Sequence, residues 1–379
     1  MKRQRLAQQG CGAKVEFLRD SGVYPEGARH VEVIETHFSW IFLTDTHAYK
    51  LKKPVRQASM DYRTLTGRMR GCRTEVRLNR RLAPTVYLGV MPLGRKRNGH
   101  LVLGRGGRIV DWLVAMRRLP AARMLDEVMV REGVTAAELR ALVGLLGSFY
   151  ARARPRPMSP SRYLQHLGGR TLANGRELLR REFQLPAHQV QALIDAQLGF
   201  IHLHAQRLGA RSSRLVEAHG DLRPEHVYLG SLSEGPAVID CLEFDAALRR
   251  LDPIDEVASL AMECMCQGAT ALARNLLNGL RAEMQDPASD ALVHFYMSQR
   301  AATRAKLAAW HLRDPKLAPR FEHWRARATD YMDSAVLFAR MAVRQSLREP
   351  SSLLKRYRPA LDQGRQGLSR KHSSKRLAK

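Results

Sequence analysis

The spacing of apolar residues changes along the chain and separates a strand-rich first part from a helix-rich remainder. In the first part, apolar and polar residues alternate or form short apolar runs, which is typical of β-strands. The predicted strands are 31–35, 40–43, 48–52, 86–93 and 101–114. Between the third and the fourth, apolar residues recur at helical spacing from Leu65 to Leu82. This order predicts a small antiparallel sheet with one helix.

A glycine-rich run at residues 104–107 interrupts the last of these strands. Such a run can also form a phosphate-binding loop, but that loop opens a helix, whereas a strand follows here. We therefore interpret residues 104–107 as a turn between strands.

Helical spacing dominates the rest of the chain, over residues 136–152, 161–181, 187–208 and most of 253–347. A loop and a short hairpin between residues 219 and 240 interrupt these helices. The last residues, 351–379, are polar and basic with few large apolar side chains, so we expect a disordered tail there. The pattern predicts an α+β fold with a sheet-bearing lobe at 1–116, a helical lobe at 117–350 and the tail at 351–379.

The chain of 379 residues carries a formal net charge of +27, from 63 Lys and Arg against 36 Asp and Glu. Three explanations stay open. The charge serves the binding of nucleic acid, or it serves the binding of an acidic metabolite. The third explanation is a general arginine bias, because arginine is scattered through every segment. The basic tail is a further candidate for weak, salt-sensitive binding to polyanions.

Cysteine usage and hydropathy predict a cytoplasmic protein. The five cysteines form no C-x-x-C pair, so we expect neither a disulfide framework nor a zinc site. No apolar run approaches the roughly 20 residues of a membrane span. The basic N-terminus lacks the apolar core of a signal peptide.

The strongest chemical signal is a loop followed by a short strand. The loop reads His219-Gly220-Asp221-Leu222-Arg223-Pro224-Glu225-His226, and the apolar run Ala237-Val238-Ile239 ends in Asp240. Phosphoryl transfer needs an aligned nucleophile and cations on the phosphate oxygens, with little covalent help from the protein. Asp221 suits the first need. Asp240 suits a magnesium ion, whose usual ligands are carboxylate and phosphate oxygens.

The loop resembles the H-G/R-D-x-x-x-x-N loop of the protein kinase-like superfamily, and Gly220 resembles its aminoglycoside phosphotransferase and choline kinase branch. Downstream, Leu251-Asp252-Pro253-Ile254-Asp255-Glu256-Val257-Ala258 is similar to the D-P-x-x-D-L-A segment of that branch. A bacterial family of uncharacterised aminoglycoside phosphotransferase-like proteins is more similar still. The matching runs are Glu35-Thr36-His37-Phe38-Ser39-Trp40, Tyr49-Lys50-Leu51-Lys52-Lys53-Pro54, Leu78-Asn79-Arg80-Arg81-Leu82-Ala83-Pro84 and Ile239-Asp240-Cys241-Leu242-Glu243-Phe244. Some members carry a further C-terminal kinase domain, but this chain has no G-x-x-x-x-G-K-S/T motif.

The resemblance implies a two-lobed, protein kinase-like fold with nucleotide-binding residues in the first lobe. Lys50 takes the place of the kinase strand lysine, and Lys52, on the same strand face, is its substitute. Glu75 is the implied partner that holds the lysine against the α- and β-phosphates. The segment from Met116 to Arg118 takes the place of the linker whose backbone pairs with the adenine edge. The glycine-rich phosphate loop of protein kinases is replaced here by Thr36-His37-Phe38-Ser39.

Two histidines belong to the loop. His219 is a supporting residue at its start. His226 stands where kinases carry Asn, and imidazole nitrogen is a poor ligand for magnesium. His226 therefore either ligates the metal directly or only hydrogen-bonds Asp221 or Asp240.

Charged residues near the loop carry further alternatives. Arg223 either neutralises charge on the γ-phosphoryl oxygens or forms a salt bridge with Glu225 or Glu243. Glu243 itself reaches the metal or the substrate. Of Asp252 and Asp255, one pins the backbone of the catalytic loop and the other caps the following helix.

We expect a phosphotransferase that uses ATP and Mg²⁺ to phosphorylate a hydroxyl or amine of a small molecule, with Asp221 as base and Asp240 as metal ligand. Two alternatives stay open. The first is a nucleotide-binding pseudokinase, which His226 and the missing glycine loop favour. The second is a nucleic-acid-binding protein on a kinase-like scaffold, which the positive charge favours.

Overall fold

The computed structural model describes residues 12–57, 60–231 and 234–348, and these form two compact units. The first unit comprises the chain up to Ser159 together with Arg211–Pro287, and the second comprises Pro160–Ala210 together with residues from Ala288 on. The lobe boundary predicted after residue 116 falls inside the first unit and stays a prediction. The predicted tail at 351–379 lies outside the described residues.

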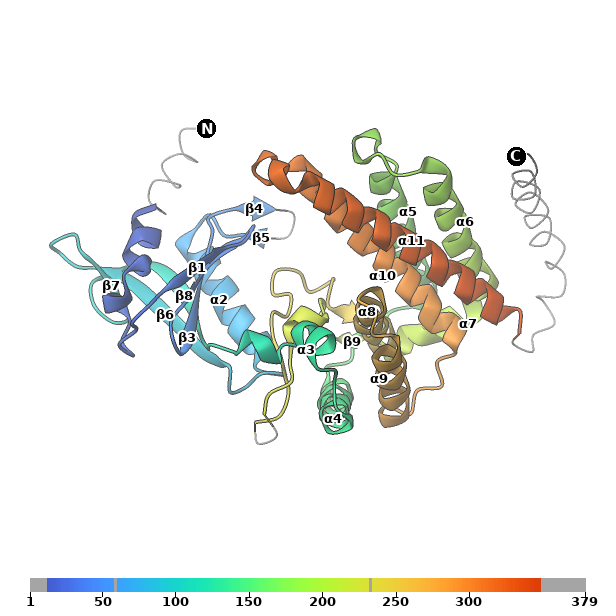
Figure 1. Ribbon diagram of the computed structural model, residues 1–379, viewed down its shortest axis with the longest axis horizontal. Helices are drawn as coiled ribbons and strands as arrows, with labels where there is room; N and C mark the ends of the chain where they lie inside the picture. The colour runs from blue at the N-terminus through green and yellow to red at the C-terminus, as the bar shows by residue number, and fades with distance from the viewer. Residues whose placement is uncertain (1–11, 58–59, 232–233, 349–379) are drawn as a thin grey trace, which may run out of the picture. The chain divides into compact units, whose positions relative to one another are not determined.

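The first unit begins with an antiparallel sheet in the strand order β1-β2-β3-β8-β6-β7 (Figure 1). Its strands are β1 Glu32–Glu35, β2 Ser39–Leu43, β3 His47–Lys52, β6 Tyr87–Arg95, β7 Leu101–Leu103 and β8 Arg108–Arg117. On β3, Tyr49 and Leu51 point into a buried cluster with Phe42 and Leu113. Since side chains alternate along a strand, Lys50 and Lys52 share the opposite face.

Helix α2, Leu65–Asn79, covers that opposite face of the sheet (Figure 1). The Thr64 hydroxyl caps its first turn by accepting a hydrogen bond from the Gly67 amide. Cys72 and Val76 pack against β6 and β8 in a second buried cluster. Glu75 lies on the same side of the helix and is fully buried, so the packing delivers its carboxylate to the two lysines.

The rest of the first unit consists of helices and short hairpins. The helices are α3 Leu125–Arg131, α4 Ala136–Arg152, α8 Pro253–Cys266 and α9 Thr270–Glu283. The short strands are β4 Arg56–Gln57 paired with β5 Met60–Asp61, β9 Val216–Glu217 paired with β12 Arg250–Leu251, and β10 Val227–Tyr228 paired with β11 Ala237–Val238. The loop 219–226 thus runs between β9 and β10, and Asp240 follows β11. Helix α8 is buried over nearly its whole length.

The second unit is helical. It contains α5 Pro160–Leu178, α6 Ala187–Leu203, α10 Asp290–Trp310 and α11 Phe321–Ser346, and the short helix α7 Ala205–Arg211 leads back to the first unit. Short 3-10 turns connect elements in both units, at Ser21–Val23, Ala121–Arg123, Arg181–Phe183, Ser212–Arg214, Pro224–His226, His311–Arg313 and Pro315–Arg320.

The predicted α+β class, with an antiparallel sheet and a helix before a helical remainder, is confirmed. The sequence analysis did not predict the further helix at residues 12–19, whose Leu18 is buried against the sheet. The helix predicted at 136–152 has those bounds, whereas the one predicted at 187–208 breaks at His204 into α6 and α7. Within the described ranges, no helix combines the length and the hydropathy that a membrane span needs.

Candidate active site

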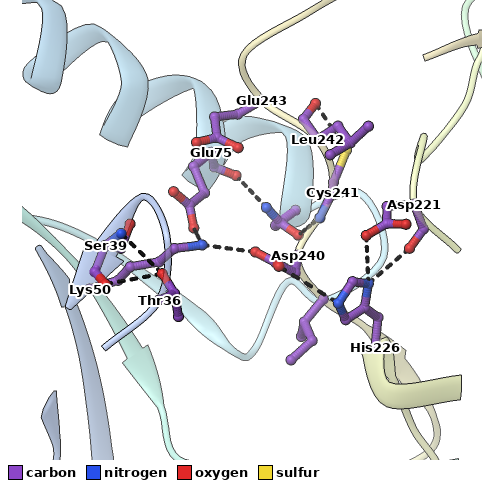
Figure 2. A network of polar contacts seen from close by, with 12 residues as sticks. Thr36, Ser39, Lys50, Glu75, Asp221, His226, Asp240, Cys241, Leu242 and Glu243 are labelled. Atoms are coloured by element: carbon purple, nitrogen blue, oxygen red, sulfur yellow. Dashed lines mark hydrogen bonds and ion pairs between the residues drawn. The ribbon is translucent and has the colours of Figure 1, made fainter. Parts of the chain in front are cut away.

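Two lysines from strand β3 converge on one buried carboxylate (Figure 2). Lys50 Nζ lies 2.9 Å from one oxygen of Glu75, and Lys52 Nζ lies 2.5 Å from the other. The Glu75 side chain is completely buried, and the Lys52 side chain is 1% exposed. Because each charge has an opposite charge at contact distance, the site can hold them away from water. The structure therefore uses both lysines, where the sequence offered Lys52 as a substitute.

The same lysines reach across to the segment that follows β11. Lys50 Nζ lies 2.8 Å from Asp240 Oδ1, and Lys52 Nζ lies 2.5 Å from Glu243 Oε1. The Tyr62 hydroxyl donates to the same oxygen of Glu243 at 2.9 Å. Burial by itself lowers the pKa of Lys52, but the carboxylates of Glu75 and Glu243 outweigh it and raise that pKa above its ordinary value. Glu243 is thus a partner of Lys52.

Asp240 takes a left-handed backbone conformation, with φ 61°. Its amide donates to the Tyr87 hydroxyl at 3.1 Å, and the next amide, of Cys241, donates to Asn79 Oδ1 at 2.8 Å. The amide nitrogen of Asn79 in turn donates to the carbonyl of Glu75 at 2.9 Å. These bonds fix the turn that aims Asp240 at Lys50 (Figure 2).

The Asp240 carboxylate is kept ionised. Burial opposes ionisation, but the Lys50 ammonium and the His226 ring outweigh it and lower the pKa of Asp240 below its ordinary value. The Asp240 side chain is nevertheless 47% exposed, so it can take a further ligand.

The loop before β10 is held by a carboxylate from helix α8. Glu256 accepts hydrogen bonds from the amides of His219, at 3.0 Å, and Gly220, and also from the Tyr150 hydroxyl at 2.9 Å. Gly220 has φ 95°, and a Cβ there would meet side-chain atoms of Leu242 at 3.1 Å. Glycine is required because the backbone is left-handed and the space is filled.

His219 supports the loop as a neutral imidazole. Its Nε2 donates to the carbonyl of Ile239 at 2.9 Å, which leaves Nδ1 to accept from the Asp221 amide at 3.4 Å. Burial, with a smaller contribution from His226, lowers the pKa of His219 to about 3. The ring therefore links the loop to the residue before Asp240.

Asp221, His226 and Asp240 lie side by side (Figure 2). His226 Nδ1 faces the Asp221 carbonyl at 2.8 Å and a carboxylate oxygen of Asp221 at 3.7 Å, and its Nε2 lies 3.7 Å from Asp240. The nearest guanidinium is that of Arg223, with Nε 3.2 Å from Asp221 and one terminal nitrogen 3.1 Å from His226 Nε2. Arg223 also lies 3.9 Å from Glu225.

The remaining predicted residues lie at the edges of this network. Met116 is in β8 opposite Ala48, and Arg118 donates its backbone amide to the carbonyl of Thr46 and its side chain to that of Thr44. The Arg118 side chain is therefore occupied at the β2–β3 turn. Thr36 closes the turn between β1 and β2, because its hydroxyl accepts from the Ser39 amide at 3.0 Å.

Asp252 and Asp255 both start helix α8 and are buried. Asp252 caps the helix by accepting from the Ile254 amide at 3.0 Å, and it accepts from Nε and one terminal nitrogen of the Arg211 guanidinium. The carboxylate that accepts from the His219 and Gly220 amides of the loop is that of Glu256. The sequence analysis missed Glu256, as well as Tyr87 and Asn79.

The donor set fits one magnesium ion bound mainly by ligands from outside the protein. Among the described residues, no group of three or more His, Cys, Asp or Glu side chains could hold a metal alone. Asp240 offers a half-exposed carboxylate beside a lysine, which suits a metal shared with phosphate oxygens.

A β3 lysine paired with a helical glutamate, a loop with an aspartate, and a strand-end aspartate facing both are the parts on which protein kinase-like enzymes are built. The strand and helix order agrees with the same architecture. The described elements fit the kinase-like α+β fold that the sequence predicts.

No family model matches the sequence. An uncharacterised protein of Mycobacterium tuberculosis is 31% identical over 283 residues, which are 73% of this chain and 54% of that protein. The chain thus spans about half the length of the curated relatives it matches. Among solved structures, a choline/ethanolamine kinase family protein from Mesorhizobium loti has 12% identity and a TM-score of 0.48, with 86% of this chain and 99% of that chain covered. The GDP complex of an aminoglycoside 2'-phosphotransferase has 13% identity and a TM-score of 0.47, with 81% and 91% covered.

Proposed function

We propose that this protein transfers the γ-phosphoryl group of ATP to a hydroxyl or amine of a small molecule. The observation that carries the proposal is the Lys50 ammonium between Glu75 and Asp240, next to the loop that holds Asp221. In this arrangement Lys50 binds phosphate, Asp240 binds the metal and Asp221 removes the proton. Each of these groups is held by hydrogen bonds or ion pairs to its neighbours.

In the proposed reaction, Asp221 orients the acceptor hydroxyl and takes its proton. The acceptor oxygen forms a bond to the γ-phosphorus as the bond to the bridging oxygen breaks, and the electron pair leaves with ADP. Lys50 neutralises charge on the α- and β-phosphates, and Glu75 keeps Lys50 in place. Arg223, which lies beside Asp221, neutralises charge on the phosphoryl oxygens as they move toward the acceptor.

Asp240 would hold magnesium, which supplies positive charge for the phosphate oxygens when it is bound. Its carboxylate is half-exposed and lies 2.8 Å from Lys50 Nζ, so the ion and the lysine would both face the phosphates. His226 takes the supporting role among the two that the sequence left open, because both of its ring nitrogens face protein groups. The expected metal count is therefore one.

The experiment combines nucleotide binding with an acceptor panel. Mg–ATP binding is measured by titration calorimetry, and ADP formation is followed with hydroxylated and amino-bearing metabolites. For the active acceptor, Asp221→Asn should lower turnover about 10²–10⁴-fold, the usual contribution of a general base, with unchanged nucleotide affinity. Asp245→Asn, in the turn after Glu243, is a control that removes the same charge and should keep most activity.

The outcomes distinguish the phosphotransferase from the nucleotide-binding pseudokinase. Equal turnover of Asp221→Asn and the wild type contradicts the role of Asp221. Tight binding of Mg–ATP without ADP formation by any acceptor class favours the nucleotide-binding pseudokinase. If neither ATP nor Mg–ATP binds, the phosphotransferase proposal is wrong.

A further inference from the structure

A second charged feature lies on the sheet, away from the lysines of β3. The end of β6, the start of β8 and the turns on either side of β7 carry Arg95, Lys96, Arg97, Arg105 and Arg108. We name these five residues the hairpin cluster. All of them are exposed, and the chain has no Asp or Glu between Glu75 and Asp111.

The strand register brings like charges together in this cluster. Arg95 and Arg108 are directly opposite in the antiparallel pair of β6 and β8, so their side chains share one face at close range. Like charges in this position repel each other and destabilise the pair. Arg95 donates to the carbonyl of Gly99, and within the described residues no carboxylate pairs with any member of the cluster.

Arginine-rich composition alone does not explain these unpaired charges. Other cations of the same sheet region have acidic partners: Lys14 lies 2.6 Å from Asp111, and Lys53 lies 2.6 Å from Glu35. The hairpin cluster differs from its surroundings because acidic residues are missing from the whole segment.

The cluster also has a concave surface. An open groove of about 450 Å³ is lined by Arg95, Lys96, Arg97, Gly107 and Arg108. Gly107 has φ 74°, and the neighbouring Gly104 and Gly106 also have positive φ. At Gly107 a Cβ would meet the carbonyl oxygen of Arg95 at 2.3 Å, so the hairpin itself requires glycine there, whereas a Cβ at Gly104 would meet nothing within 4 Å.

We propose that the hairpin cluster binds the phosphate backbone of double-stranded nucleic acid. Arginine forks match phosphate oxygens in pairs, and several cations along a groove suit a chain of phosphates better than one ion. Single strands are held largely by stacking of bases on aromatic side chains, and the groove is lined by none. Binding is therefore independent of sequence and strongly dependent on salt.

The test compares two triple variants of the full chain. The first is Lys96→Ala, Arg97→Ala and Arg108→Ala. The matched control is Arg140→Ala, Arg152→Ala and Arg274→Ala, which removes the same charge from exposed helical positions on α4 and α9. Thermal melting shows that both variants stay folded. Fluorescence anisotropy with a labelled DNA duplex gives the affinity across a series of potassium chloride concentrations.

In the hairpin variant, the slope of log affinity against log salt concentration should be smaller in magnitude by about 2.7, which is 0.9 for each of three lost contacts. Affinity at 0.1 M salt should fall by up to about 8-fold per contact, while the control stays close to the wild type. An equal loss in the control would show that net charge is responsible. An unchanged slope in the hairpin variant, tighter binding of a single strand of equal length, or equal competition by polyglutamate would each overturn the proposal.

Discussion

Replacing Glu256 with Gln tests how the loop that carries Asp221 is held. The Glu256 carboxylate is 1% exposed and accepts from the amides of His219 and Gly220 and from the Tyr150 hydroxyl. Glutamine has the same shape but only one acceptor oxygen. One backbone amide is then left without an acceptor, which costs about 1–3 kcal/mol, and the other bond loses its charge assistance, about 1 kcal/mol more. We expect the free energy of unfolding to fall by about 2–4 kcal/mol.

The loss should appear in turnover more than in nucleotide affinity. The displaced amide precedes Asp221, and a shift of about 1 Å in a reacting group costs about 100-fold in rate. Lys50 and Asp240 are fixed by other elements, so the affinity for Mg–ATP should change little. Urea denaturation, calorimetric titration and ADP formation measure the three quantities.

Tyr150→Phe is the matched control for Glu256→Gln, because it removes one donor to Glu256 and leaves both backbone amides in place. Its turnover should stay near that of the wild type. Wild-type stability and turnover in Glu256→Gln would refute the reasoning. A comparable loss of turnover in Tyr150→Phe would show that packing around α4 and α8, and not the grip on the backbone, positions the loop.

Three further perturbations follow from the site. Lys52→Met should destabilise the protein by about 3–5 kcal/mol, since it leaves Glu75 facing Glu243 without the buried cation; a urea midpoint equal to that of Lys50→Met would contradict this. Asp240→Asn should weaken binding of Mg–ATP far more than binding of metal-free ATP in calorimetric titrations, and equal losses would indicate a structural role. The pKa of His219 is about 3 in the folded chain against an ordinary 6.5, so the unfolded chain takes up a proton that the folded chain refuses. The free energy of unfolding should therefore fall by up to about 1.4 kcal/mol per pH unit between about pH 6.5 and pH 5, and His219→Asn should lack this slope in urea titrations.

The sequence was informative where a function depends on neighbouring residues in one segment. The loop 219–226 is one continuous segment, and Asp240 directly follows an apolar run. The alternation on β3 placed Lys50 and Lys52 on one face. The structure brings all of these groups together with Glu75. Their catalytic roles stay predictions that the experiments above test.

Sequence reasoning failed where the partner comes from a distant element. Asp252, Asp255 and Glu256 all occupy the start of α8, and the choice among them depends on the rotation of the helix against the loop. That rotation is set by the packing of α8, which is buried on nearly every side and gives no apolar stripe to read. Tyr87 and Asn79 received no role from the sequence, although Asn79 lies in one of the matching runs, because each hydrogen-bonds to the Asp240 turn across more than 150 residues of chain.

The left-handed backbone of Asp240 links the stability of the fold to the proposed magnesium site at a single position. A residue with a Cβ is strained by up to about 1–2 kcal/mol in that conformation, whereas glycine avoids the strain but loses about 0.5–1 kcal/mol more in backbone entropy on folding. The contact with Lys50 that glycine would forfeit involves a half-exposed carboxylate and contributes about 1 kcal/mol or less. Asp240→Gly is therefore expected to be nearly neutral for stability, although it removes the proposed magnesium ligand. A homologue that no longer needs catalysis is expected to replace this aspartate and keep its fold. Glycine at position 240 would therefore indicate an inactive homologue.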